Sequence, residues 1–147
     1  MNIFESLRRS HLTQRMLADQ LLEAPARSRE RLTLFKQLKT ELAAHAAAEE
    51  RCFYVPLIGH DSTQEPARHG IAEHHELDEL VEVLEDLESV SPNWLQKARE
   101  LRHKVYHHLA DEEQGIFQQA ANVLSEAEKV SLAQAYEDEF SAQREKV

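Results

Sequence analysis

The sequence predicts an all-α protein: an up-down-up-down four-helix bundle with a short additional C-terminal helix. The 147 residues include only three glycines and four prolines, whereas residues that favour helix, such as Leu, Ala, Glu and Gln, are abundant. Apolar residues recur at helical spacing along several long segments, and no segment shows the alternation typical of a strand. The connections between these segments are short, so we expect consecutive helices to lie antiparallel.

The first two helices are predicted from their apolar stripes and their ends. One stripe covers about residues 3–23, and the segment around Pro25 stops it. The second helix is expected over about residues 28–57, with the hydroxyl of Ser28 as its cap. Pro56 should kink or end this helix, because proline lacks the N–H that a helix interior uses.

The third helix is predicted after a connection at residues 59–63. Ser62 and Glu65 have the spacing of a capping box, and Pro66 would lie in the first helical turn. An apolar stripe then continues to about Leu87. We therefore expect the helix to begin after Ser62.

The last two helices also have clear start signals. Ser91-Pro92 is typical of a cap followed by a first helical residue, and the fourth helix should run to about residue 123. Ser125 and Glu128 form another capping box and open a fifth helix over about residues 125–145. We expect this fifth helix to pack across one end of the bundle or to make a dimer contact.

Length, charge and cysteine content exclude several classes of protein. The chain is long enough for one buried core, so we expect a single domain over residues 1–147, with the bundle at about 3–123. A net charge of −10 argues against nucleic acid or an anionic membrane as a partner. No apolar run has the length of a membrane span, the N-terminal segment is amphipathic, and Cys52 has no second cysteine to pair with. A cytoplasmic location is therefore expected.

Two His-x-x-x-Glu motifs lie on the apolar faces of predicted helices. Residues four apart share one helix face, so His45 with Glu49 can offer a nitrogen and an oxygen to one metal region. His108 with Glu112 can do the same, and both pairs lie on apolar stripes. The same spacing between His75 and Glu79 falls on a charged face, which is expected to be solvated.

An internal repeat supports an inward position for two further histidines. His11 and His45 are 34 positions apart, and so are His74 and His108. Of the neighbours His74 and His75, and of the neighbours His107 and His108, only His74 and His108 keep both the repeat spacing and the apolar phase. The repeat indicates two similar helix pairs related by a pseudo-twofold axis.

Six inward side chains therefore form the candidate metal site, and bundle cores are where such sites are built. The stripes carry no Lys or Arg that could neutralise two buried carboxylates, so metal ions are the expected partners. A mixed imidazole and carboxylate set suits iron, with manganese or zinc as alternatives. If the glutamates and an oxo or hydroxo group bridge two ions, about two coordination positions stay open for a small molecule. The predicted ligands are His11, His45, Glu49, His74, His108 and Glu112.

Residues near these ligands have supporting roles in this interpretation. Glu50 and Glu113 are expected to accept hydrogen bonds from ligating histidines, with a solvated position or direct metal ligation as the alternatives. Gly70 and Gly115 lie inside predicted helices, where glycine is unfavourable, and we expect them to make room for a small molecule or its access path. Tyr54 is expected to serve packing. The other histidines should lie at the surface, with a supporting role as the alternative for His69.

The order His, His-x-x-x-Glu, His, His-x-x-x-Glu, with each motif followed by a second glutamate and an aromatic residue, resembles the hemerythrin-like (HHE cation-binding) family. The resemblance covers about residues 3–123 and implies a non-haem di-iron centre bridged by carboxylates and an oxo group. Members of this family bind dioxygen, sense oxygen, iron or nitric oxide, or react with peroxide. Oxygen carriers of the family have a second histidine where this chain has Asp78. Asp78 is either an additional ligand or turns away and leaves an open position; both favour sensing or redox turnover over oxygen carriage.

The sequence thus leaves three functions open. The first is binding or sensing of dioxygen or nitric oxide, with the signal passed to a separate partner; the chain could also form a homodimer. The second is an enzyme that acts on peroxide, dioxygen or nitric oxide. The third is iron handling.

Overall fold

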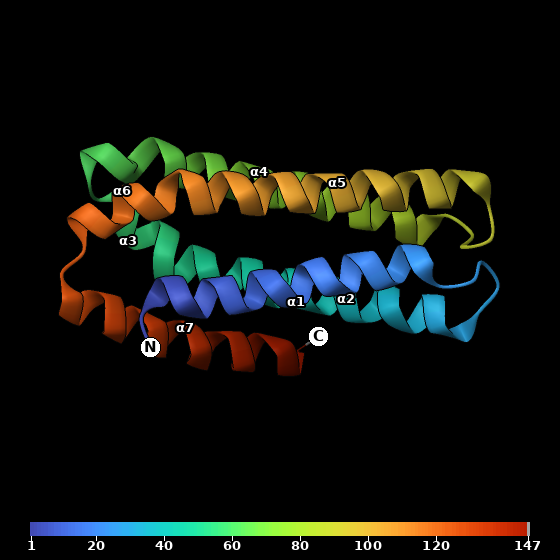
Figure 1. Ribbon diagram of the computed structural model, residues 1–147, viewed down its shortest axis with the longest axis horizontal. Coiled ribbons are helices and arrows are strands. Elements are labelled where there is room, and N and C mark those ends of the chain that lie inside the picture. Colours follow the sequence, from blue (N-terminus) through green and yellow to red (C-terminus); the bar gives the residue numbers. More distant parts are fainter. Residues whose placement is uncertain (147) are drawn as a thin grey trace.

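The structure, a computed structural model, describes residues 1–146, and every regular element within them is a helix. Four long helices run alternately up and down and pack side by side (Figure 1). They are α1 (Ile3–Glu23), α2 (Arg29–Glu49), α4 (Asp61–Asp86) and α5 (Pro92–Gln114). The predicted all-α four-helix bundle is confirmed. None of the helices in this part of the chain combines the length and the apolar character needed to cross a membrane.

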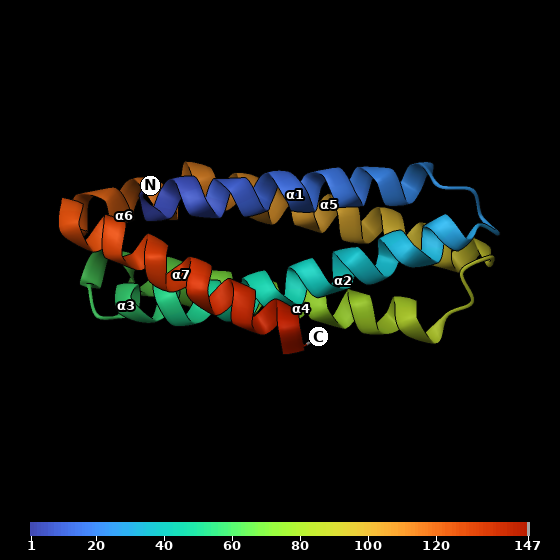
Figure 2. The same ribbon diagram turned by 90° about the horizontal axis from the view of Figure 1, so that it is seen from below.

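The additional C-terminal helix, α7 (Glu126–Lys146), is also confirmed, but it does not pack across one end of the bundle. It runs back along the outside of α1 and α2, as Figure 1 and Figure 2 show from two directions. The reason lies in its inner face, where Ala133 and Tyr136 are buried against the bundle. This position brings Tyr136, near the end of the chain, close to the bundle interior.

Three of the four predicted helix starts are confirmed. The hydroxyls of Ser28 and Ser91 accept hydrogen bonds from the backbone of α2 and α5, and Ser125 forms the predicted capping box with Glu128. The predicted start of the third helix is wrong, because this helix, α4, begins at Asp61 rather than after Ser62. The hydroxyl of Thr63 donates to the carbonyl of Leu57 at 2.7 Å, which ties the start of α4 to the preceding turn.

Two helices that were expected to be continuous are interrupted within three residues of the motif glutamates. A π-helical turn, η1 (Glu50–Tyr54), follows Glu49 and leads into the short helix α3 (Val55–Ile58). Its place next to Pro56 is consistent with the missing N–H of proline. On the other side, α5 ends at Gly115 and α6 (Ile116–Val123) begins. A Cβ at Gly115 would lie 2.8 Å from the carbonyl oxygen of Asp111, so the break brings the backbone too close for a larger residue.

The buried apolar side chains form two clusters with the histidines between them. One cluster includes Leu38 and Leu101 and lies toward the α1–α2 and α4–α5 connections. The other includes Phe53 and Phe117 and lies toward α3, α6 and α7. Each of the four predicted inward histidines falls between members of the two clusters along its own helix. The polar layer is thus enclosed by apolar packing above and below.

Candidate metal centre

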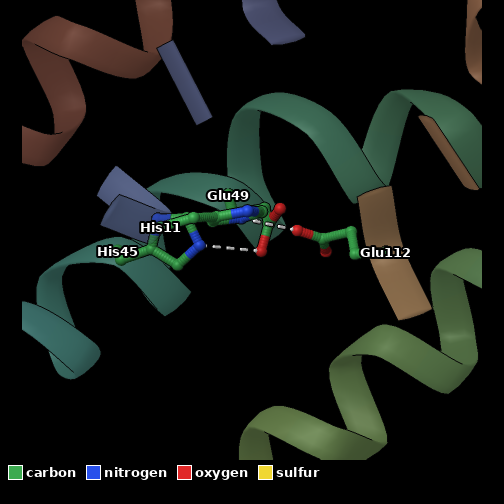
Figure 3. Close-up of side chains that lie close together, drawn as sticks. All are labelled: His11, His45, Glu49 and Glu112. Carbon is green, nitrogen blue, oxygen red and sulfur yellow. Dashed lines mark ion pairs between the residues drawn. The ribbon is translucent and has the colours of Figure 1, made fainter. Parts of the chain in front are cut away.

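The structure brings the six predicted ligands together at one level of the bundle. One histidine comes from each of α1, α2, α4 and α5, and the glutamates come from α2 and α5. All six are buried, with exposed fractions of 7% or less. Figure 3 shows four of them, His11, His45, Glu49 and Glu112, pointing toward one another.

The two carboxylates lie between the histidines. Glu49 Oε1 is 3.1 Å from Nε2 of both His45 and His74. Glu112 Oε1 is 3.0 Å from Nε2 of His11, and its Oε2 is 3.9 Å from Nε2 of His108. Each glutamate therefore faces one histidine of its own helix and one of another helix. This is the pattern that the internal repeat requires.

The donor atoms fall into two overlapping groups. The ligand atoms of His11, His45, Glu49 and Glu112 lie within 4.8 Å of one another, and so do those of Glu49, His74 and His108. Glu49 belongs to both groups. The donor atoms therefore form two neighbouring groups, each of which could hold a cation, and the groups share one carboxylate.

Each histidine makes a hydrogen bond through Nδ1, on the side away from the centre. The partners are Glu113 for His11, Tyr136 for His45, Glu50 for His74 and Glu73 for His108, at 2.7 to 2.8 Å. A carboxylate can only accept, so three of the four Nδ1 atoms donate. In the neutral ring this leaves the lone pair on Nε2, which faces the centre. Glu50 and Glu113 thus accept hydrogen bonds from the histidines, as the sequence analysis expected.

The atoms that face the centre have the character of metal ligands. Among residues 1–146, nine buried side-chain atoms find no hydrogen-bond partner, and seven of them belong to the predicted ligands: Nε2 of His11, His45, His74 and His108, both oxygens of Glu49, and Oε1 of Glu112. Most buried polar atoms are hydrogen-bonded, and leaving one unsatisfied is costly. Lone pairs that converge without donors are satisfied by cations, so the residues fit a metal centre.

Protons take the place of the cations in the metal-free site. Burial disfavours a charge on His11 and His74, but their contacts with the neighbouring glutamates outweigh burial and raise the pKa of His11 to about 9 and that of His74 to about 10. Burial instead lowers the pKa of His45 to about 4, helped by the charges of His11 and His74, and the contact with Glu49 does not offset this. Burial and the nearby Glu49 raise the pKa of Glu112. Burial opposes the charge on Glu49, but His45 and His74 hold its pKa well below its usual range.

Tyr54 has a role that the sequence analysis missed, because it was expected only to pack. Its hydroxyl donates to Glu112 Oε2, and burial raises its pKa well above its usual range, which keeps the proton on the phenol. Gly70 makes this contact geometrically feasible, since a Cβ there would lie 2.5 Å from Cζ and the hydroxyl oxygen of Tyr54. The available signal was the position of Tyr54, five residues after Glu49 on the motif helix.

The two halves of the bundle differ in how they support their second histidine. Ser10 precedes His11, and its hydroxyl lies 2.6 Å from the hydroxyl of Tyr136, which contacts His45. The equivalent position in the other half is Glu73, and it accepts directly from His108. His45 is thus supported by two neutral hydroxyls, those of Tyr136 and Ser10, whereas His108 is supported by a carboxylate. The sequence alone gave no signal for either contact, since both join distant parts of the chain.

Pockets on two sides of the bundle reach the centre from outside. One, of about 210 Å³, is lined by both Gly70 and Gly115 and by Tyr54, His108 and Glu112. The other, of about 270 Å³, opens between α2 and α4 beside three of the buried histidines, and exposed Asp78 is part of its lining. Asp78 is outside both groups of converging donor atoms in the described chain.

The remaining histidines lie at the surface, as expected, and Cys52 is buried. The five other histidines are exposed: His60, His69, His75, His103 and His107. The thiol of Cys52 is buried and free. Neither observation adds a ligand to the six-residue group.

Comparisons with known proteins agree with this geometry. The family model described as the hemerythrin HHE cation binding domain matches residues 2–120. Among solved structures, a hemerythrin HHE cation-binding domain-containing protein from Mycobacterium kansasii has a TM-score of 0.90 and 23% sequence identity. The alignment covers 99% of this chain and 89% of that one, and at this identity it shows a shared fold. A search of curated proteins found no match.

Proposed function

Because this chain belongs to the hemerythrin HHE cation-binding family, we propose that it holds two iron ions and binds or senses a small diatomic molecule, dioxygen or nitric oxide. The convergence of the seven unpartnered donor atoms carries the proposal. Four imidazole nitrogens and four carboxylate oxygens suit iron, with manganese or zinc as alternatives. When bound, a carboxylate- and oxo- or hydroxo-bridged iron pair supplies redox electrons and open coordination positions for the small molecule.

Some side chains would bind the ions directly, and others would hold these ligands in place. His11, His45, His74 and His108 would bind through Nε2, and Glu49 and Glu112 would bridge. The Nδ1 partners hold each ring in the tautomer and orientation that binding needs. In this proposal Asp78 turns away from the ions, in keeping with its exposure, and leaves a position open.

Access to the centre is proposed through the pocket lined by Gly70 and Gly115. Side chains at these two positions would narrow the passage to Glu112. We expect Gly115→Leu to slow the binding of nitric oxide to the reduced protein, measured by stopped-flow absorption. Unchanged rates in a folded, metal-loaded variant would refute this path.

Redox turnover of peroxide, dioxygen or nitric oxide is the second candidate function, and Tyr54 favours it. Its hydroxyl holds a proton beside Glu112 and lines the same pocket. A proton donor at this point can protonate a substrate whose bond breaks as it is reduced. Simple reversible binding does not require one.

The first experiment measures metal content in variants with matched controls. His74→Ala and His108→Ala should lose metal and lower the melting temperature, because metal bound to the native state adds to stability. His75→Ala and His107→Ala remove exposed neighbours on the same helices and should retain about two ions per chain. Full occupancy in His74→Ala or His108→Ala would contradict the ligand assignment.

The second experiment separates the two candidate functions. The reduced, metal-loaded protein is exposed to dioxygen without other substrates, and its visible absorption is followed. A spectrum that reverses under vacuum indicates binding. Irreversible oxidation with consumption of added peroxide indicates redox turnover, which Tyr54→Phe should slow if the phenol supplies the proton.

A further inference from the structure

A second group of metal-binding side chains lies on the outside of the bundle, between α4 and α5. Ligand atoms of His69, Glu73 and Asp111 lie within 4.8 Å of one another. His69 Nε2 is 3.5 Å from Glu73 Oε2 and 3.8 Å from Asp111 Oδ2, too far for good hydrogen bonds. The side chains of His69 and Asp111 are 61% and 53% exposed. An imidazole and two carboxylates thus face one another at the surface.

Glu73 connects this group to the buried centre. Its Oε1 accepts the hydrogen bond from Nδ1 of His108 at 2.7 Å, while its Oε2 faces His69. The carboxylate is 13% exposed and is held in place by the bond to His108. One carboxylate therefore serves a buried ligand on one side and the outer group on the other.

A pocket joins the two groups independently of these contacts. The pocket of about 210 Å³ is lined by His69, Glu73 and Asp111 at its outer side and by the buried residues His108 and Glu112. Within the described chain, Glu112 Oε1 is one of the buried atoms that find no hydrogen-bond partner. The pocket therefore leads from the surface group to a buried carboxylate oxygen that has no hydrogen-bond partner.

More potential ligands stand around Glu73. A neighbouring pocket of about 370 Å³ is lined by His69, Glu73 and His108 together with the exposed His103 and His107. The sequence analysis expected His103 and His107 to be ordinary surface residues, and His69 to be one unless it supports the site. These exposed histidines gather around Glu73, a carboxylate that also contacts the buried His108, and this distinguishes the face.

We propose that His69, Glu73 and Asp111 form an outer site for a divalent transition-metal ion, from which ions pass to the buried centre. This inference rests on the proposed function, since it assumes that the buried residues hold ions. One nitrogen and two oxygen donors suit Fe²⁺, Mn²⁺ or Zn²⁺. With three protein ligands and an exposed position, water completes the coordination and the ion exchanges readily.

The equilibrium test counts Mn²⁺ ions. In dialysis against Mn²⁺ without oxygen, the parent chain should take up two tightly held ions and a third, weaker one. His69→Ala and Asp111→Asn should lose the third ion and keep the other two. Glu79→Gln is the matched control, because it also removes one exposed carboxylate near the same helix pair and changes the net charge equally. Uptake of only two ions by the parent would overturn the outer site.

The kinetic test measures delivery. Metal-free protein is mixed with Fe²⁺ under anaerobic conditions, and the filling of the buried centre is timed from samples quenched with chelator. Asp111→Asn should fill about tenfold more slowly than Glu79→Gln, the low end of what a charged approach path contributes to association rates. Equal rates would overturn delivery. If the parent holds no tight ions but keeps a weak one that Asp111→Asn removes, the proposed function is wrong and the outer site stands.

Discussion

Glu50 and Glu113 should set how many protons the centre releases when it takes up metal ions. In the metal-free protein the pKa values of His11 and His74 are about 9 and about 10, so both rings are protonated at pH 7. Only a neutral imidazole binds a metal ion, so loading must displace both protons. We expect about two protons per chain from these rings, and an apparent affinity that rises about hundredfold per pH unit between pH 7 and 8.

Replacing the outer carboxylates tests this count. Glu113→Gln and Glu50→Gln each remove the negative charge that contacts Nδ1 of one protonated ring. The pKa of that ring then falls toward its ordinary value of 6.5. Each variant should therefore release fewer protons at pH 7, by as much as about one per chain. Glu79→Gln, which removes an exposed carboxylate elsewhere on α4, should release the same number as the parent.

The assay is calorimetric titration with Zn²⁺ in two buffers of different ionisation enthalpy. The difference between the two heats gives the number of protons released. A bridging hydroxide formed from water adds the same number in the parent and in every variant, so the comparison between them is unaffected. Equal release by the parent, Glu50→Gln and Glu113→Gln, at equal metal occupancy, would refute the assignment of protonated histidines.

The remaining predictions concern stability and are measured by thermal or denaturant unfolding. His11 and His74 have raised pKa values, so their contribution to the stability of the metal-free protein is full below pH 6.5 and is lost as the pH rises through about 9 and 10. The metal-loaded protein should not lose stability over that range. Tyr54→Phe should destabilise the metal-free protein by about 1.5–3 kcal/mol, because the lost bond is to a charged carboxylate, whereas Tyr136→Phe should cost about 0.5–1.5 kcal/mol. Equal costs would argue against an ionised acceptor at Tyr54. Gly70→Ala should cost about 1–3 kcal/mol, because its Cβ collides with the ring of Tyr54. A neutral Gly70→Ala would show that the ring moves freely.

Helical periodicity together with the internal repeat was sufficient to predict the six converging side chains. The apolar phase of each helix identified His45, Glu49, His108 and Glu112, because burial along one helix depends only on residues of that helix. The repeat spacing then selected His74 over its neighbour. The structure places all of these side chains at one level, where their donor atoms converge.

Contacts between helices could not be predicted in the same way. Whether Glu73 reaches His108, or Tyr136 reaches His45, depends on the relative heights and rotations of separate helices. Those are set by the packing of the whole core. The π-helical turn after Glu49 shows the same limit, since an extra residue in one turn rotates everything that follows, Tyr54 included.

The position of α7 has a practical consequence for anyone who shortens the chain. The family match ends at residue 120, but Tyr136, which lies beyond it, caps the outer nitrogen of His45 and meets the hydroxyl of Ser10. A fragment trimmed to the recognised boundary would uncover that nitrogen and the apolar surface around it. Truncation at residue 120 would thus remove a side chain that supports the candidate metal centre.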